Sequence, residues 1–375
     1  MKKFVELIQR VHQERFSVVR NKILAEKIPV AFLSLAPINN AIQTVNKLRE
    51  QGGVNIKTLI TLDAPPPQSN FDVVHINDAL KIRPRPEYIL VVDDISARVA
   101  IKYLPYCQTI SFYSDWYNVR DSEKVYQIFM THLKELQEVY ESFIDEESRK
   151  VFCGYWLGKI SNKFGEYVFS RNVQYIMPGF IPERGAILME GGVFNGTTSA
   201  FFSDMGYKVY AFELDKTSYE RSKKLAEEKN VVLENIGLGS FDGTLRYNEN
   251  GDVGNRWNLN GKNSAPVITL DTYVLKNKIP HVDFIKLDVE GAEYDTLSGA
   301  KTILSRWKPI LAISAYHKLD DFWSLTNLIK SIRPDYEFAL RQFAQPSCGE
   351  GAAHLYSLGL HPEDRNFNEC VLFAR

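Results

Sequence analysis

The chain has 375 residues, which exceeds the usual size of one domain and favours two domains, or one domain with a large extension. Its composition is 45% hydrophobic and 24% charged, and its formal net charge is −1. These values are ordinary for a globular enzyme and give no general attraction to nucleic acid or to an anionic membrane.

The cysteines and the apolar runs indicate where in the cell we expect the protein. The four cysteines are far apart, with no C-x-x-C pair and no Cys/His cluster, so we expect neither a zinc site nor a disulfide framework. We therefore expect the protein in the reducing cytoplasm. Charged residues interrupt every apolar run near the first residue, so no signal-peptide core forms. No stretch approaches the roughly 18 apolar residues of a membrane span.

Residues 1–115 predict a small α/β domain. Apolar runs of strand length lie at 28–35, 56–63 and 88–94, and the segment INNAIQTVNKLREQGG between the first two has helical spacing. Strand, helix, strand implies a parallel unit. The turn after the first strand, SLAPINN, has no glycine that would let the backbone approach a pyrophosphate. We therefore expect a degenerate Rossmann-like domain that serves structure or recognition and binds no nucleotide.

Residues 116–182 predict a helical connector. Apolar side chains at spacings of three and four run through 121–143 and form one stripe of a long helix. Asp145 is a candidate N-cap for the next helix, which continues toward Pro178 and Pro182.

Residues 183–375 predict a larger domain in which strands and helices alternate. We expect strands at 186–190, 207–213, 231–236, 283–288 and 309–316, helices from about 196 and at 216–229, 271–277 and 291–305, and a loop rich in glycine and asparagine at 237–263. This pattern is typical of an open, doubly wound, Rossmann-like sheet, whose ligands bind beyond the carboxyl ends of the strands.

The first turn of this domain, EGGVFNG, predicts a cofactor site. Glu190 ends the strand, and Gly192 and Gly196 flank the turn that also contains Phe194 and Asn195. A dinucleotide fingerprint would require glycine in place of Phe194, and no P-loop motif follows. S-adenosylmethionine has no phosphates, so a side chain there is tolerable. Its carboxylate can lie at the helix start, and Glu190 can face its ammonium group.

Two further residues are candidates for the nucleoside part of this cofactor. Glu213 ends the next strand at the spacing of about 20 residues at which an acid accepts both ribose hydroxyls. A solvated strand end is the structural alternative. Asn235 ends the third strand and is a candidate for the adenine side, although it would equally well cap the following turn.

The last two strands predict the catalytic residues. Asp288 and His317 end neighbouring strands, and either could accept the proton that a hydroxyl loses on methylation. Glu290 and Glu293 follow in the first helical turn, where the helix dipole favours acids whatever the function.

A metal site is not demanded by the sequence. Asp288 with Glu290, or Asp320 with Asp321, could hold Mg²⁺ with carboxylates and water, but the spacing does not require it. We therefore assign no metal-binding residues.

These residues carry a family resemblance. The segments KLDVEGAEYDTLSGAKTIL and KPILAISAYHKLDDFWSLTNLIKSIRPDYEFALR resemble the FkbM-type methyltransferases, and DEESRKVF and QYIMPGF are similar to their leader. The resemblance covers about residues 145–343 and the segment NECVLFA. It implies a class I methyltransferase fold that uses S-adenosylmethionine, usually on hydroxyls of sugars or polyketide-like products.

The resemblance also assigns roles by position. Glu190, Gly192 and Gly196 match the glycine-bearing first motif, Glu213 matches the ribose acid, and Asp288 and His317 match the acid and the histidine of the two later motifs, D-V-E-G-A-E and Y-H-K. The family usually has aspartate where this chain has Glu190 and alanine where it has Val193. The loop at residues 344–367 is longer than the corresponding loop of the family. The extra residues would either influence the choice of acceptor or be a tolerated insertion.

The function we expect is S-adenosylmethionine-dependent O-methylation of a sugar, glycan or related acceptor, with the first domain positioning the acceptor or another protein. We expect no nucleic-acid partner and no membrane span, and the sequence predicts no oligomeric state. A scaffold protein that keeps the fold without turnover is the main alternative. An NAD-dependent oxidoreductase is disfavoured by Phe194 and by the glycine-free turn SLAPINN of the first domain.

Overall fold

The computed structural model describes residues 1–13, 16–50, 53–63, 70–91, 96, 99–100, 104–111, 122–161, 166–170, 172–247, 263–343 and 369–375. The described residues form two compact units. Unit 1 contains residues up to 133 and residues 150–169, and unit 2 contains 134–149, 170–343 and 369–375. The expected connector, 116–182, therefore contributes residues to both units.

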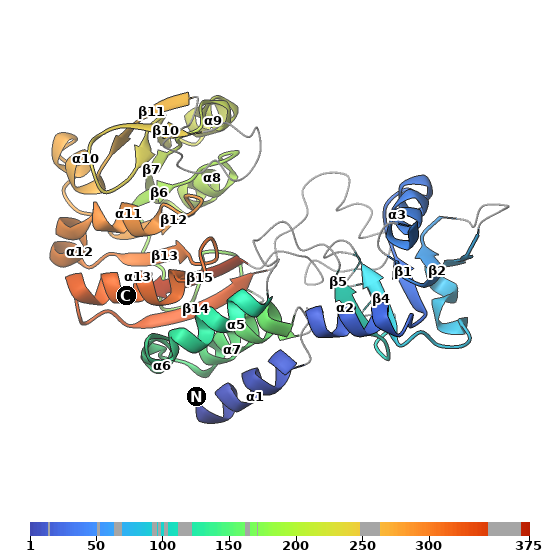
Figure 1. Ribbon diagram of the computed structural model, residues 1–375. Helices are drawn as coiled ribbons and strands as arrows, with labels where there is room; N and C mark the ends of the chain where they lie inside the picture. The colour runs from blue at the N-terminus through green and yellow to red at the C-terminus, as the bar shows by residue number, and fades with distance from the viewer. Residues whose placement is uncertain are drawn as a thin grey trace. The chain divides into compact units, whose positions relative to one another are not determined.

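Unit 1 contains a five-stranded sheet with the order β3-β2-β1-β4-β5, in which every paired strand is parallel (Figure 1). The strands are β1 (Val30–Leu33), β2 (Ile56–Thr61), β3 (Asp72–His75), β4 (Tyr88–Val91) and β5 (Gln108–Ser111). The expected strands correspond to β1, β2 and β4, and residues 92–94 lie outside the described part. The strands β3 and β5 were not predicted, because neither contains a long apolar run.

The described part of unit 1 also contains helices, and further helices lead into unit 2. They are α1 (Lys2–Gln13), α2 (Phe16–Ala25), α3 (Ile38–Glu50), the short η1 (Ile76–Lys81), α5 (Ser122–Thr131), α6 (Leu133–Ser142) and α7 (Glu146–Ser161). The expectation of one long helix over 121–143 was wrong, because the chain turns at His132 between α5 and α6. Asp145 caps α7 as expected: its carboxylate accepts a hydrogen bond from the Ser148 amide at 2.7 Å.

Unit 2 is built on a seven-stranded sheet with the order β14-β15-β13-β12-β6-β7-β8 (Figure 1). Its strands are β6 (Ile187–Gly191), β7 (Lys208–Phe212), β8 (Val232–Glu234), β12 (Phe284–Leu287), β13 (Ile310–Ser314), β14 (Phe338–Phe343) and β15 (Glu369–Ala374). All pairs are parallel except those of β15, which lies antiparallel between β13 and β14. This confirms the expected α/β sheet and adds β14 and β15.

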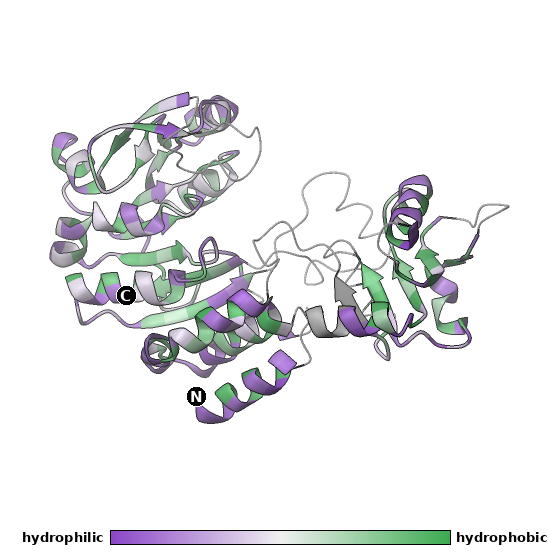
Figure 2. Ribbon diagram, viewed as in Figure 1, coloured by the Kyte–Doolittle hydropathy of each residue, from purple (hydrophilic) through white to green (hydrophobic). Residues whose placement is uncertain are grey.

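The helices described between β6 and β14 are α8 (Thr197–Asp204), α9 (Lys216–Glu228), α10 (Leu270–Lys276), α11 (Glu293–Ser298), α12 (Lys301–Trp307) and α13 (Asp321–Ile332). Figure 2 shows mainly hydrophobic strands and helices with hydrophilic outer faces. Every residue of β6, β12, β14 and β15 is buried. Strands covered on both faces lose the alternation of polar and apolar residues, which explains the continuous apolar runs in the sequence.

Two expectations for unit 2 were wrong. The segment 237–263 contains strands β9 (Gly237–Leu238) and β10 (Gly243–Tyr247), which form a three-stranded sheet with β11 (Asn263–Ile268), and residues 248–262 lie outside the described part. The helix expected at 291–305 is divided into α11 and α12. The carboxylate of Asp271 accepts hydrogen bonds from the amides of Thr302 and Ile303 and so caps α12 from another helix.

The parallel strands bring the predicted site residues to one edge of the sheet. β6, β7, β12 and β13 all end there, and the residues that follow or close them include Glu190, Glu213, Asp288 and His317. Among the described residues, no helix is long and apolar enough to span a membrane.

Candidate active site

The turn after β6 depends on glycine. Gly192 and Gly196 have φ values of 81° and 80°, and Phe194 between them has φ of 55°. A Cβ atom on Gly192 would lie 1.7 Å from the carbonyl oxygen of Asp288, so no side chain fits there. The glycine therefore allows the turn to pass directly against the end of β12.

Glu213 holds the same turn from the end of β7. One carboxylate oxygen accepts hydrogen bonds from the amides of Val193 and Phe194, both at 3.0 Å, and the other accepts one from the Asp215 amide at 2.9 Å. The residue is only 9% exposed. Its contact with a ribose stays a prediction, and the structure adds that it fixes the conformation of the turn.

Asn235 has a backbone role. Its side-chain amide donates to the carbonyl oxygens of Glu213 at 2.9 Å and of Leu214 at 3.3 Å. These bonds hold the end of β8 against the end of β7. A contact between Asn235 and adenine stays a prediction.

The other residues of the turn differ in exposure. Phe194 is 40% exposed, and the guanidinium of Arg221 lies 5.3 Å from its ring centroid. Asn195 accepts hydrogen bonds from both the amide and the hydroxyl of Thr197 and so closes the turn into α8. Gly196 is the N-cap of that helix and offers no side chain to its first amides.

Glu190 lies beneath the turn, paired with a buried lysine that the sequence analysis did not single out. The Lys286 ammonium lies 3.4 Å from the Glu190 carboxylate and donates a hydrogen bond to the Gly192 carbonyl oxygen at 2.8 Å. The Ser199 hydroxyl donates to Glu190 at 2.5 Å. Burial raises the pKa of Glu190, against the opposing effects of Lys286 and Ser199. Glu190 is fully buried, so it supports the turn from below, and its contact with a cofactor ammonium stays a prediction.

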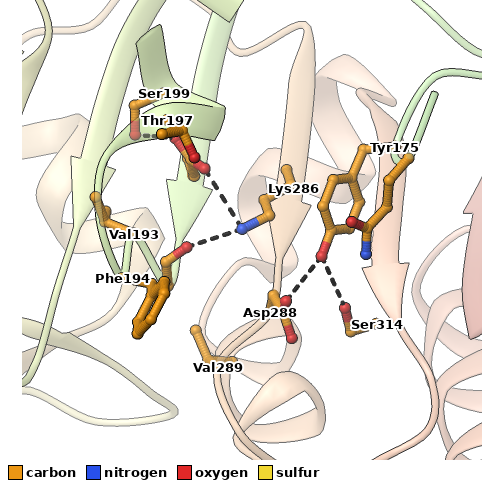
Figure 3. Close-up of polar contacts among 12 residues, drawn as sticks. Tyr175, Val193, Phe194, Thr197, Ser199, Lys286, Asp288, Val289 and Ser314 are labelled. Atoms are coloured by element: carbon orange, nitrogen blue, oxygen red, sulfur yellow. Dashed lines mark hydrogen bonds and ion pairs between the residues drawn. The ribbon is translucent and has the colours of Figure 1, made fainter. Parts of the chain in front are cut away.

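The carboxylate of Asp288 accepts hydrogen bonds from two tyrosine hydroxyls. Tyr175 donates to one carboxylate oxygen at 2.7 Å and Tyr316 to the other at 3.1 Å. Figure 3 places the Tyr175 hydroxyl between Asp288 and Ser314. Burial would raise the pKa of Asp288, but the charges of Lys286 and His317 outweigh it and hold the pKa below its usual value. Asp288 is therefore an ionised acceptor.

His317 is enclosed by carboxylates. Its Nε2 atom lies 3.6 Å from Asp288 and 3.4 Å from Glu290, and its Nδ1 atom lies 3.0 Å from Glu293. Burial would lower the pKa of His317, but the three carboxylates, Glu293 first, raise it well above its usual value. Asp288 and His317 thus lie next to each other at the ends of adjacent strands, and their catalytic role stays a prediction.

Glu293 is the residue whose importance the sequence analysis underestimated. It was assigned to the helix dipole, yet its fully buried carboxylate faces His317 and accepts a hydrogen bond from the Val289 amide at 2.9 Å. Ligand atoms of Asp288, Glu293 and His317 all lie within 4.8 Å of one another. No sequence signal separates this glutamate from an ordinary first-turn acid, because its role depends on the neighbouring strand.

Asp321 adds a further buried acid. Burial, and then the nearby Glu293, raise its pKa to about 7. Its carboxylate accepts a hydrogen bond from the Lys318 amide at 2.7 Å. Asp321 therefore closes the turn after β13, and Asp320 beside it is exposed.

Comparisons with known proteins agree with this arrangement. Residues 190–349 match the model of the methyltransferase FkbM domain. A methyltransferase FkbM from Methylobacillus flagellatus KT is similar in structure, with a TM-score of 0.65 and 15% sequence identity over 99% of each chain. An rRNA methylase from Streptococcus thermophilus has a TM-score of 0.28 and 17% identity over 52% of this chain and 87% of its own. No curated protein sequence matches this chain.

The similarity to the Methylobacillus protein shows the fold: an α/β protein of the class I methyltransferase type, as expected. The family match confirms the predicted class of reaction and supports S-adenosylmethionine as the cofactor, because it is the methyl donor of such enzymes. Residues 190–349 therefore match the FkbM methyltransferase domain, which supports methyltransferase activity.

Proposed function

We propose that this protein transfers the methyl group of S-adenosylmethionine to a hydroxyl oxygen of a sugar, glycan or related acceptor. The observation that carries the proposal is the position of Asp288 and His317 beside the glycine turn, at the ends of adjacent strands. A donor held at the turn would lie next to the two groups that can act on a hydroxyl.

The turn is suited to the donor. Gly192 and Gly196 allow its left-handed backbone, the first amides of α8 can receive a carboxylate, and Glu213 directly follows β7, where a ribose would lie. The carbohydrate acceptor is supported by the resemblance of the D-V-E-G-A-E and Y-H-K elements, which contain Asp288 and His317.

The reaction is an in-line displacement. A C–O bond forms between the acceptor oxygen and the methyl carbon while the C–S bond of the sulfonium breaks, and its electron pair stays on sulfur in S-adenosylhomocysteine. The acceptor hydroxyl must also lose its proton. In a site without a cation, the ionised Asp288 can receive it within hydrogen-bond reach, whereas His317, whose pKa is raised, can receive it only after it has lost its own proton.

Binding separates this proposal from the alternatives. We expect S-adenosylmethionine and S-adenosylhomocysteine to give saturable heats in a calorimeter, and NAD to give none. Binding of NAD alone would overturn the proposal. Methyl transfer from labelled donor to a panel of sugars and glycans then separates an enzyme from a scaffold, because a scaffold would bind the donor without turnover.

The catalytic assignment has its own test. We expect His317→Ala to keep the affinity for S-adenosylmethionine and to lower turnover by about 10² or more, the usual contribution of a proton-transfer group. His281→Ala is the control, because that histidine is 49% exposed and pairs with Asp283 away from Asp288. Equal turnover of the two variants would remove His317 from the mechanism.

A further inference from the structure

The carboxylates around His317 exceed the positive charge that this residue can supply. Asp288, Glu290 and Glu293 all lie within 3.6 Å of its ring nitrogens. Three carboxylates around one imidazolium leave an excess of negative charge in a partly dehydrated place, which is costly unless it is compensated. A divalent cation would provide that compensation.

The hydrogen bonding of the same residues points to a ligand. The His317 side chain is only 4% exposed, and its ring nitrogens lie against carboxylates without a well-formed hydrogen bond among the described residues. One carboxylate oxygen of the buried Glu293 is also without a partner in the described part of the chain. Buried polar atoms in this state are uncommon and usually indicate a bound water or ion.

We propose that Nε2 of His317 and the carboxylates of Asp288 and Glu290 bind one divalent transition-metal ion such as Mn²⁺, and that Glu293 positions the imidazole from Nδ1. Imidazole nitrogen favours first-row transition ions over Ca²⁺, and carboxylates suit Mn²⁺. A carboxylate beside the second nitrogen of a metal-binding histidine fixes the tautomer that offers its lone pair to the ion.

Two of the three separations in this set of ligands are given by the ion pairs of Nε2. Ligand atoms at right angles around an ion, each about 2.1 Å from it, are about 3 Å apart. The separations of 3.6 Å and 3.4 Å from Nε2 to Asp288 and Glu290 need only a small contraction. The side chains of Asp288 and Glu290 are 22% and 25% exposed, so solvent or a substrate oxygen can reach their side of the cluster.

Tyrosine contacts leave Asp288 able to bind an ion. Tyr175 and Tyr316 each donate to a different carboxylate oxygen. Each oxygen has two lone-pair sites, so the one facing Nε2 keeps a position for the cation. The sequence suggested Asp288 with Glu290 as an optional Mg²⁺ pair, and the structure adds an imidazole, which changes the preferred ion.

The role of the ion rests on the proposed function, although its binding does not. A cation next to the methyl donor would bind the acceptor hydroxyl and lower its pKa, which eases loss of the proton. His317 would then act as a ligand, and its Nε2 could not receive that proton.

Direct binding tests the site without any substrate. Full-length protein treated with a chelator is titrated with Mn²⁺ alone and followed by electron paramagnetic resonance, with Ca²⁺ as a competitor. We expect one saturable Mn²⁺ site that Ca²⁺ displaces poorly. His317→Asn and Glu290→Gln should each weaken it at least about tenfold, and Glu293→Gln by about 10-fold to 100-fold, the usual range for a residue behind a ligand.

Asp320→Asn is the matched control, because this acid is close in sequence, exposed, and makes no capping hydrogen bond. It should bind Mn²⁺ like the unchanged protein. Absence of saturable binding, or binding that survives His317→Asn and Glu290→Gln, would overturn the site. Glu290→Gln changes a partly exposed residue, so it keeps the test valid if the histidine variant fails to fold.

Methyl transfer then separates the two proposals. Saturable Mn²⁺ binding with no methyl transfer to any acceptor would contradict the proposed function and leave the cation site standing. Methyl transfer at full rate in chelator-treated protein would contradict the role of the ion and leave the proposed function standing.

Discussion

At Gly192 the chain has no room for a side chain. We expect Gly192→Ala to destabilise the fold by more than the roughly 1–2 kcal/mol that a left-handed backbone costs a residue with a Cβ atom, because the new atom would lie 1.7 Å from the Asp288 carbonyl oxygen. Gly185→Ala is the control: its φ is 94° and nothing lies within 4 Å. Equal losses of unfolding free energy for the two variants, measured by denaturant unfolding, would show that the close approach to Asp288 does not contribute to stability.

Single residues show what the sequence can and cannot reveal about the site. Asp288 and His317 were predicted because each follows a strand end, and strand ends of a parallel sheet converge. Glu293 was missed, since its contact with His317 joins a helix to a different strand. Lys286 was missed as well: a lysine inside an apolar strand was visible in the sequence, but its partners, Glu190 and the Gly192 carbonyl, were not.

At the scale of elements, the N-cap residue of α7 also forms an ion pair with β14. Asp145 caps α7 and pairs with Arg341 of β14 at 3.0 Å, and Arg341 also lies 3.3 Å from Glu147. Burial would raise the pKa of Asp145, but the hydrogen bonds from Arg341 and Ser148 outweigh it and lower the pKa. A lowered pKa means that this stabilisation is complete above the unfolded-state value and is lost as the pH falls through the folded-state value.

We therefore expect Asp145→Asn, which keeps the cap and removes the charge, to lower the free energy of unfolding by about 1–2 kcal/mol at neutral pH. The difference should shrink below pH 3.8, where the Asp145 carboxylate becomes protonated. Urea unfolding between pH 7 and pH 3 measures it. Asp335→Asn is the control, because its ion pairs with Lys308 and Arg333 are exposed. A difference that is the same at every pH would contradict the ion pair.

Element types followed from the sequence more reliably than element boundaries. Continuous apolar runs identified β6, β12 and β13, because strands covered on both faces must be apolar. The same criterion failed for β9, which has only two residues, and for β10 and β11, which are partly exposed. It also joined α11 to α12, whose separation depends on a cap from Asp271 that is distant in the sequence.

At the scale of the whole molecule, segments distant in sequence meet in the core of unit 2. Phe373 on β15 is fully buried, and its ring lies 6.1 Å from that of Phe180 and 6.5 Å from that of Phe343. We expect Phe373→Ala to cost about 3–5 kcal/mol in denaturant unfolding. Leu275→Ala, at a residue that is 79% exposed, should cost little. Similar losses for the two variants would show that β15 is not part of the cooperative core.

The sequence by itself determined the parallel α/β sheet, the glycine turn that excludes a pyrophosphate, and the residues at the strand ends. These are local in origin, because periodicity, turn chemistry and strand ends are read along the chain. Only the tertiary structure decided that Lys286 supports the turn, that β15 lies between β13 and β14, and that three carboxylates surround His317. Such contacts join distant segments, and charges act through space on whatever the fold brings near them.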